Sequence, residues 1–165
     1  MESWLDYKKV FQNISISDML DEIFSISRVQ DEVIRLNQEQ LTQGLDSDKK
    51  VIITDKAKIE NAGHVYAINT IRGTSRYKGK IEKGQPYKEV TLKDTGQFYN
   101  SFRLLIREKY YEILADFRKG DENIMDNFRT SDFEFLGLSD DNLEQLIIHT
   151  ILPQLGKMIN DRVFL

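Results

Sequence analysis

The chain has 165 residues, of which 40% are hydrophobic and 10% aromatic, and its formal net charge is −4. This length and composition suffice for the core of one domain of ordinary size, so we expect a single domain over 1–165. The lack of cysteine excludes disulfides and thiolate metal sites, and the two histidines, His64 and His149, lie far apart in the sequence. We therefore expect neither a metal nor a cofactor.

The apolar runs of the chain are short. Runs such as 51–53 and 146–148 fall far below the ~20 residues that a helix needs to cross a bilayer. The first residues have neither the basic start nor the apolar middle of a secretory signal. The sequence therefore predicts a soluble protein made in a cytoplasm, with no membrane partner.

The charges are distributed unevenly along the chain. From Arg72 to Lys93, seven bases stand against two acids, a local excess of +5 that leaves −9 for the remaining residues. An acidic body with one long basic loop, at about 62–93, is suited to docking against an acidic partner or a neighbouring copy of itself. The alternative is a loop that only faces water. The candidate contact residues are Arg72, Arg76, Lys78, Lys80, Lys83, Lys88 and Lys93.

The N-terminal half predicts one long helix and then an irregular region. After residues 1–14, whose role stays open, Ser15 and Asp18 form a capping box, and apolar residues follow at helical spacing for about six turns. Gly44 can supply the left-handed C-cap. Residues 51–54 predict a short strand, and 55–93 a long excursion with a short helix near 55–61.

The C-terminal half predicts a hairpin and a second strong helix. Two apolar runs within 102–117, separated by charged residues, favour an antiparallel hairpin over the alternative of one continuous helix. We expect a short helix at 120–128 and an exposed loop at 129–138. A helix then opens after Ser139, with a kink or break at Pro153 because proline lacks an amide donor. Its apolar stripe is Leu143, Leu146, Ile147, Ile151, Leu155, Met158 and Ile159.

The triplet Asp94-Thr95-Gly96 is the pattern that aspartic proteases use for their paired carboxylates, and a chain this short would form the pair by dimerisation. Such a site is entered by a buried apolar strand, whereas Lys93 directly precedes this triplet. We expect instead that Asp94 caps the helix that carries Phe98. No enzymatic activity is therefore expected, and a homodimeric aspartic protease is the last of three alternatives.

The basic loop also has aromatic residues interleaved with its bases. Single-strand binders arrange stacking platforms in this way, although anchoring of the loop explains the same residues. The glycines near Lys78 and Lys83 do not lead into the lysine-serine or lysine-threonine helix start of a phosphate-binding loop. A non-catalytic module that contacts nucleic acid or a host protein is the second functional hypothesis. The tyrosines concerned are Tyr66, Tyr77, Tyr87 and Tyr99.

The middle of the chain has four features in a fixed order. A basic segment comes first, then a lysine followed by glycine and proline, then a short extended piece, and last an Asp-Thr-Gly turn. This order resembles tailed-phage virion-morphogenesis proteins of the tail-completion and minor-tail, or neck, type. The residues that carry the resemblance are Lys80, Lys83, Gly84, Pro86, Leu92, Asp94, Thr95, Gly96, Phe98 and Ser101. Segments 37–48 and 135–143 are similar to the versions in phages of Bacteroides-type bacteria.

The resemblance implies an α+β fold, in which a small antiparallel sheet (hairpin 102–117 plus short strands) is flanked by a long N-terminal helix and a C-terminal helix. It implies a non-catalytic ring of about six or twelve identical subunits at the head–tail connector, neck or tail. Portal, adaptor or tail-tube proteins would be its neighbours, and DNA would only pass through the ring. The location implied is the virion, assembled in the cytoplasm of the host bacterium.

Overall fold

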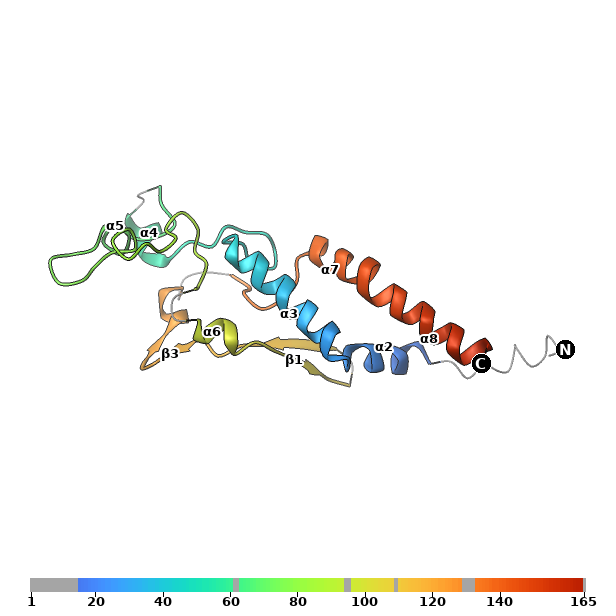
Figure 1. Ribbon diagram of the computed structural model, residues 1–165. Helices are drawn as coiled ribbons and strands as arrows, with labels where there is room; N and C mark the ends of the chain where they lie inside the picture. The colour runs from blue at the N-terminus through green and yellow to red at the C-terminus, as the bar shows by residue number, and fades with distance from the viewer. Residues whose placement is uncertain (1–14, 61–62, 94–95, 109, 129–132, 165) are drawn as a thin grey trace.

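The computed structural model describes residues 15–60, 63–93, 96–108, 110–128 and 133–164. In Figure 1, α3 and the helix formed by α7 and α8 lie along one side of a β-hairpin, and a segment with α4 and α5 extends at the end of the molecule opposite the end of α8. The expected α+β class, with a small antiparallel sheet and a C-terminal helix, is confirmed. The helices away from that segment are α2 (Ile16–Phe24), α3 (Ser27–Thr42), α6 (Gln97–Asn100), α7 (Asp140–Leu146) and α8 (Leu152–Phe164).

Two N-terminal helices replace the single helix that we expected. The start is as predicted, because the Ser15 hydroxyl accepts a hydrogen bond from the Asp18 amide at 3.2 Å. The break comes at Ser25, whose hydroxyl donates to the Asp21 carbonyl at 2.7 Å, and Ile26 is extended. A serine bonded to its own turn competes with helix propagation. The predicted end is confirmed, since Gly44 follows the last turn of α3 with φ of 73°.

The predicted hairpin is confirmed, and one continuous helix over 102–117 is excluded. Strand β1 (Arg103–Ile106) pairs antiparallel with β2 (Tyr111–Leu114). Leu104 faces Ile113 across the pair, so the apolar side chains share one face as the alternation predicts.

Tyr111 fastens this hairpin to α2. Its ring stacks on Phe24 with 3.8 Å between the centroids, and its hydroxyl donates to Asp21 Oδ1 at 3.0 Å. Burial, with a smaller contribution from the Asp21 carboxylate, raises the pKa of Tyr111 to about 12. The phenol therefore stays a hydrogen-bond donor over the whole physiological range.

Two buried amide side chains of α3 hold the segment that leads into α7. The Asn37 amide donates to the Phe135 carbonyl at 3.0 Å, and Gln40 Oε1 accepts from the Ser139 amide at 2.9 Å. The prediction of an exposed loop is therefore wrong for Phe135, which is 3% exposed. Buried amides of this kind satisfy backbone groups that would otherwise need water. Residues 129–132 of the predicted loop lie outside the described residues.

The C-terminal helix passes Pro153 without a break. The disturbance is taken up by a π-helical turn, η2 (Ile147–Ile151), in which the Leu152 amide donates to the Ile147 carbonyl five residues back. Such turns relieve the register where a regular hydrogen bond is missing. The expected break is therefore wrong, although the residue responsible was identified.

Two further local predictions need correction. Residues 51–54 form no strand: Val51 makes one isolated antiparallel bridge, to Leu45. Residues 120–128 are helical only over Ile124–Asn127, a 3-10 turn called η1. Before η1, two short strands pair antiparallel instead: β3 (Arg118–Lys119) and β4 (Glu122–Asn123).

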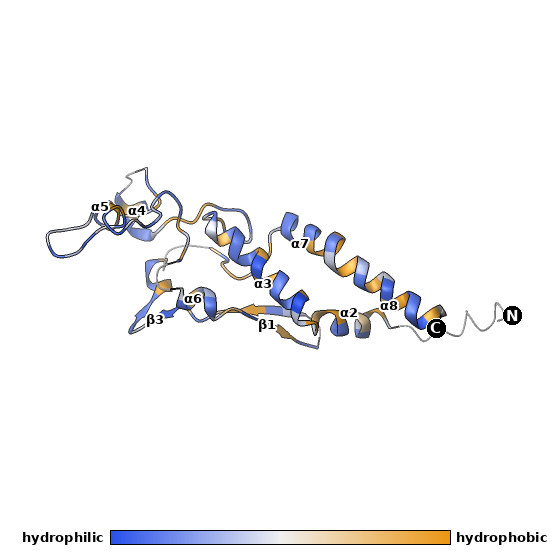
Figure 2. Ribbon diagram, in the orientation of Figure 1, coloured by the Kyte–Doolittle hydropathy of each residue, from blue (hydrophilic) through white to orange (hydrophobic). Residues whose placement is uncertain are grey.

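The core has two parts. The first is largely aromatic and lies where the extended segment joins the body; its buried members are Leu41, Ile52, Tyr66, Ile71, Val90, Leu92, Phe98, Phe102, Phe128 and Phe135. The second is aliphatic and joins the helices to β1; its buried members are Ile23, Val29, Val33, Leu36, Leu104, Leu146 and Ile151. Figure 2 shows the corresponding hydrophobic stretches on the hairpin and along α7–α8.

Candidate functional site

The predicted basic loop is an arm with a fixed base. We call residues 63–93 the basic arm; with α4 (Asp55–Glu60), which confirms the helix predicted there, it forms the extended end of the molecule in Figure 1. Its helix α5 (Ile68–Arg72) was not predicted. Buried Tyr66 and Val90 hold the arm in the aromatic part of the core. At the C-terminal end of the arm, where it joins the body, the Tyr99 hydroxyl donates to the Thr91 carbonyl at 2.6 Å. Burial raises the pKa of that phenol.

Two glycines let the two sides of the arm pass at close range. Gly73 pairs with Lys78 in an isolated antiparallel bridge. A Cβ added to Gly79 would lie 2.2 Å from the Gly73 nitrogen, and one added to Gly73 would lie 2.5 Å from the Gly79 nitrogen. No side chain fits in that space, so both positions need glycine for backbone approach.

Backbone hydrogen bonds then close the arm around its tip. Lys80 donates to the Thr70 carbonyl at 2.9 Å, and Ile81 to the Ile71 carbonyl at 3.1 Å. The Thr74 hydroxyl accepts from the Tyr77 amide at 3.2 Å and so supports the turn at the tip. The arm therefore has a defined backbone, although its sequence shows no sustained period.

The seven predicted basic contact residues do not form one cluster. Lys80 is half-buried, with its Nζ 4.5 Å from the Tyr66 ring centroid, a cation–π contact. The remaining six are exposed: Arg72, Arg76, Lys78, Lys83, Lys88 and Lys93. Lys78, Lys80, Lys83 and Lys93 line one cavity, whereas Arg72, Arg76 and Lys88 do not.

That cavity, of about 400 Å³, lies between the basic arm and the segment from β4 to η1. Its apolar lining includes Tyr66, Val90 and Phe128. Lys56 of α4 also lines it; sequence reasoning missed this residue because the basic excess was counted only from Arg72 onward. The charged lining residues are Lys56, Lys78, Lys80, Lys83, Lys93, Asp55, Glu122 and Asp126. Five cations against three anions, over an apolar floor, suit a ligand that is both acidic and apolar.

The residues of the predicted structural motif serve the base and the turns of the arm. Gly84 has φ of 64° in a turn, and Leu92 is buried with a left-handed φ of 53°. Phe98 is buried in the aromatic part of the core. The Ser101 hydroxyl accepts from the Asp116 amide at 2.7 Å, and Pro86 is exposed.

The Asp-Thr-Gly triplet is only partly described. Gly96, with φ of 85°, occupies the N-cap position of α6, the place that we expected for Asp94. Asp94 and Thr95 lie outside the described residues, so neither the capping role of Asp94 nor a catalytic pairing of its carboxylate is tested.

The described part of the chain contains no group of three or more histidine, aspartate or glutamate side chains that could hold a metal ion. His64 and His149 are both exposed. Within the same residues, no helix has the length and apolar character to cross a bilayer.

Comparisons with known proteins add no assignment. No family model matches the sequence, no curated protein matches it, and no solved structure matches the fold. The function must therefore be argued from the arm, its cavity and the charges around them.

Proposed function

We propose that this chain is a non-catalytic structural subunit of a tailed-phage virion, which forms an oligomeric ring at the head–tail connector, neck or tail and joins portal to tail. The observation that carries the proposal is the separation of charge between the ends of the molecule. The arm has seven bases and two acids. The helices α2, α3, α7 and α8 have ten acids and four bases.

A subunit charged in this way favours contacts between unlike ends. The basic arm occupies one end in Figure 1, and the acidic helices run from its base to the opposite end. Long-range attraction between unlike ends orients two copies head to tail. Such heterologous contacts repeat and close into a ring when the rotation between neighbours permits.

The phage setting rests on the sequence resemblance. Its residues Gly84, Leu92 and Phe98 fall at a turn and at the base of the arm, where they would fix how the arm is presented. Segments 37–48 and 135–143, which carry the rest of the resemblance, touch through Asn37. In the virion, the ring would meet portal, adaptor or tail-tube proteins, and DNA would only pass through it.

The mass of the purified chain in solution tests this proposal. Native mass spectrometry and sedimentation at low salt should give a closed oligomer of about six or twelve copies, which weakens as salt screens the charges. A chain that stays monomeric at every concentration, alone and with portal or tail proteins, contradicts a ring subunit.

A nucleic-acid-binding module is the second candidate function. Two exposed tyrosines of the arm favour it, Tyr77 at 75% and Tyr87 at 39% exposure, because both stand beside basic residues. A fluorescent single-stranded oligonucleotide should then bind at low micromolar concentration, with an affinity that falls steeply with salt. The ring proposal predicts no such binding.

A homodimeric aspartic protease remains the third alternative, because the structure leaves Asp94 undescribed. If the wild-type chain cleaved a peptide library in a pepstatin-sensitive way and Asp94→Asn did not, the chain would be a protease and the proposed structural role would be wrong.

A further inference from the structure

The outer face of the C-terminal helix is apolar although it covers no core. Four large aliphatic side chains on it are between 39% and 52% exposed. They lie within residues 143–152, about 14 Å of helix. We call Leu143, Ile147, Ile148 and Leu152 the outer face. Leu143 and Ile147 are four residues apart, as are Ile148 and Leu152, so each pair is adjacent on the helix surface. Adjacent exposed apolar side chains mark an interaction surface more often than single ones do.

The π-helical turn explains why this face exists. The buried side chains Leu146 and Ile151 are five residues apart, the separation that a hydrogen bond of a π turn spans. Ile147 and Leu152 are also five apart, and both are exposed. Of the stripe predicted from the sequence, Leu146 and Ile151 are thus buried with α3 and β1, whereas Leu143 and Ile147 are exposed and belong to the outer face.

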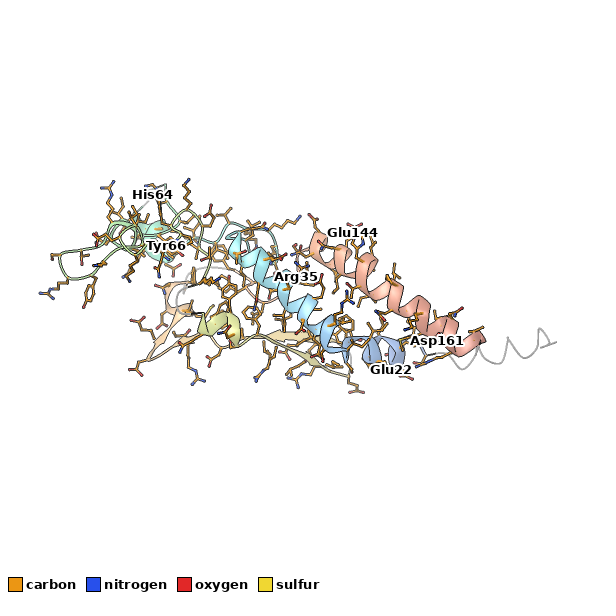
Figure 3. All side chains as sticks on the ribbon, in the orientation of Figure 1. Glu22, Arg35, His64, Tyr66, Glu144 and Asp161 are labelled. Atoms are coloured by element: carbon orange, nitrogen blue, oxygen red, sulfur yellow. The ribbon has the colours of Figure 1, made fainter. Side chains whose placement is uncertain are left out.

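Acidic side chains flank the outer face. Asp140 and Glu144 are exposed on α7, and Glu144 lies on the side of the helix away from the hairpin (Figure 3). Asp141 is engaged with Lys49. The outer face therefore combines a short apolar row with negative charge at its N-terminal end.

The cavity beneath the basic arm has a net positive lining, with five cations against three anions. Its floor is apolar, and exposed Lys78 and Lys83 line it. Tyr77 and Ile81 of the arm are 75% and 52% exposed. Both surfaces thus have an apolar part, and their net charges are opposite. Opposite charges attract two partners and favour one orientation, and apolar parts can be buried between them.

We propose that the outer face of one copy docks into the arm cavity of a second copy, as a helix laid in a groove. Leu143 and Ile147, one turn apart, enter the cavity, and Glu144 meets the lysines at its edge. This inference rests on the proposed function, since it names the contact through which the copies would join.

The contact must be between copies because of how the elements are arranged. The inner face of α7–α8 packs on α3 of the same chain, and the arm extends beyond the end of α3 in Figure 1. A stable interface buries about 800 Å² on each partner, so the surface around the outer face of one copy and around the cavity of the other must join the contact. One contact uses two different surfaces, so it leaves a free arm and a free face for the next copy.

Complementary variants test the contact. The arm variant carries Lys78→Glu and Lys83→Glu, and the face variant carries Glu144→Gln and Ile148→Ser. All four side chains are exposed, so circular dichroism and thermal melting should match the wild type. A control variant, Arg28→Glu with Lys157→Glu, makes the same charge change as the arm variant at exposed positions outside both surfaces.

Sedimentation should show at least tenfold weaker self-association for the arm and face variants and wild-type behaviour for the control. An equal mixture of the arm and face variants should give a discrete dimer and nothing larger, because only one intact contact remains. Oligomers that persist in both variants would overturn this contact while leaving the ring in place. A wild-type chain that is monomeric alone and with portal or tail proteins would overturn both.

Cross-linking tests the same contact without disturbing its charge. The chain has no cysteine, so Ile147→Cys in one copy and Tyr77→Cys, in the cavity lining of another, introduce the only thiols. Oxidation of the mixture should join them, and replacing Ile147→Cys by Lys157→Cys should abolish the product. Absence of the cross-link would overturn the contact. Protection of the arm by a single-stranded oligonucleotide, in a chain that stays monomeric, would assign the cavity to another ligand.

Discussion

The helical body and the basic arm are held in different ways. In the body, buried side chains of α3, such as Asn37 and Gln40, bond the backbone of a segment about a hundred residues later. In the arm, two glycines and short backbone hydrogen bonds define the path, while most charged side chains stay exposed. The buried polar side chains of α3 therefore stabilise the fold of the body, whereas most charged side chains of the arm are exposed on a surface that a partner can reach.

This difference indicates where changes will affect stability and where they will affect binding. A polar group removed from the body leaves buried partners without a hydrogen bond, which costs much more than an exposed bond. A lysine changed on the arm removes charge from solvent and costs little stability. The following predictions test that division.

The largest loss of stability is expected from Gln40→Leu. Its carbonyl oxygen accepts from the Ser139 amide at 2.9 Å and from Asn142 Nδ2 at 3.3 Å, and leucine leaves both donors without it. The unfolding free energy should fall by about 3 kcal/mol. Urea denaturation should show a lower midpoint with an unchanged slope. Gln43→Leu, at an exposed position just past the helix, is the control and should change stability by less than about 0.5 kcal/mol.

The arm should loosen in Gly79→Ala without unfolding of the body. The new Cβ would meet backbone atoms at 2.2 to 2.5 Å, so the two sides of the arm must separate, at a cost of about 2 kcal/mol. Hydrogen exchange should accelerate at Lys80 and Ile81 and stay unchanged at Val33. Gly84→Ala is the control, because it has open space and only a left-handed φ, so about 1 kcal/mol is expected. Equal effects of the two substitutions would show that close approach does not hold the arm.

A smaller effect, dependent on pH, is expected from Tyr111→Phe. Loss of the hydrogen bond to Asp21 should cost about 1 kcal/mol at pH 7. Because the folded state raises the pKa of this phenol from about 10 to about 12, it holds the proton that the unfolded chain releases. Wild-type stability should therefore fall between pH 10 and 12. The variant should lose less over that interval, and a parallel decline in both chains would contradict the assignment.

The smallest change is a gain, from Gly156→Ala. Gly156 lies inside α8, is exposed, and has nothing within 4 Å of an added Cβ. Alanine should stabilise the helix by about 0.5 to 1 kcal/mol by reducing the freedom of the unfolded chain. A rise in melting temperature with unchanged self-association would agree with this, since the position is outside both proposed contact surfaces.

Much of the body could be predicted from the sequence because its determinants are local. Alternating apolar residues indicated the hairpin, and Ser15 and Gly44 indicated where the helical region begins and ends. The break at Ser25 was missed, since a single serine bonding back to its own turn disturbs no apolar period.

The candidate site could be predicted less well because it depends on long-range contacts. The basic excess located the arm, but not which lysines share a cavity or that β4 and η1 form the opposite wall. The outer face arose from a change of register at the π turn, which a regular helical period cannot anticipate. Phe135 was expected in an exposed loop because its partner, Asn37, is nearly a hundred residues away.

The central claim is that the arm of one copy receives the outer face of another. Hydrogen exchange of the wild-type chain, compared at concentrations where it is monomeric and where it is assembled, tests this most directly. We predict added protection of the arm around 74–88 and of the helix around 143–152, with the hairpin β1–β2 unchanged. Equal protection in the two states, or protection confined to other segments, would contradict the account.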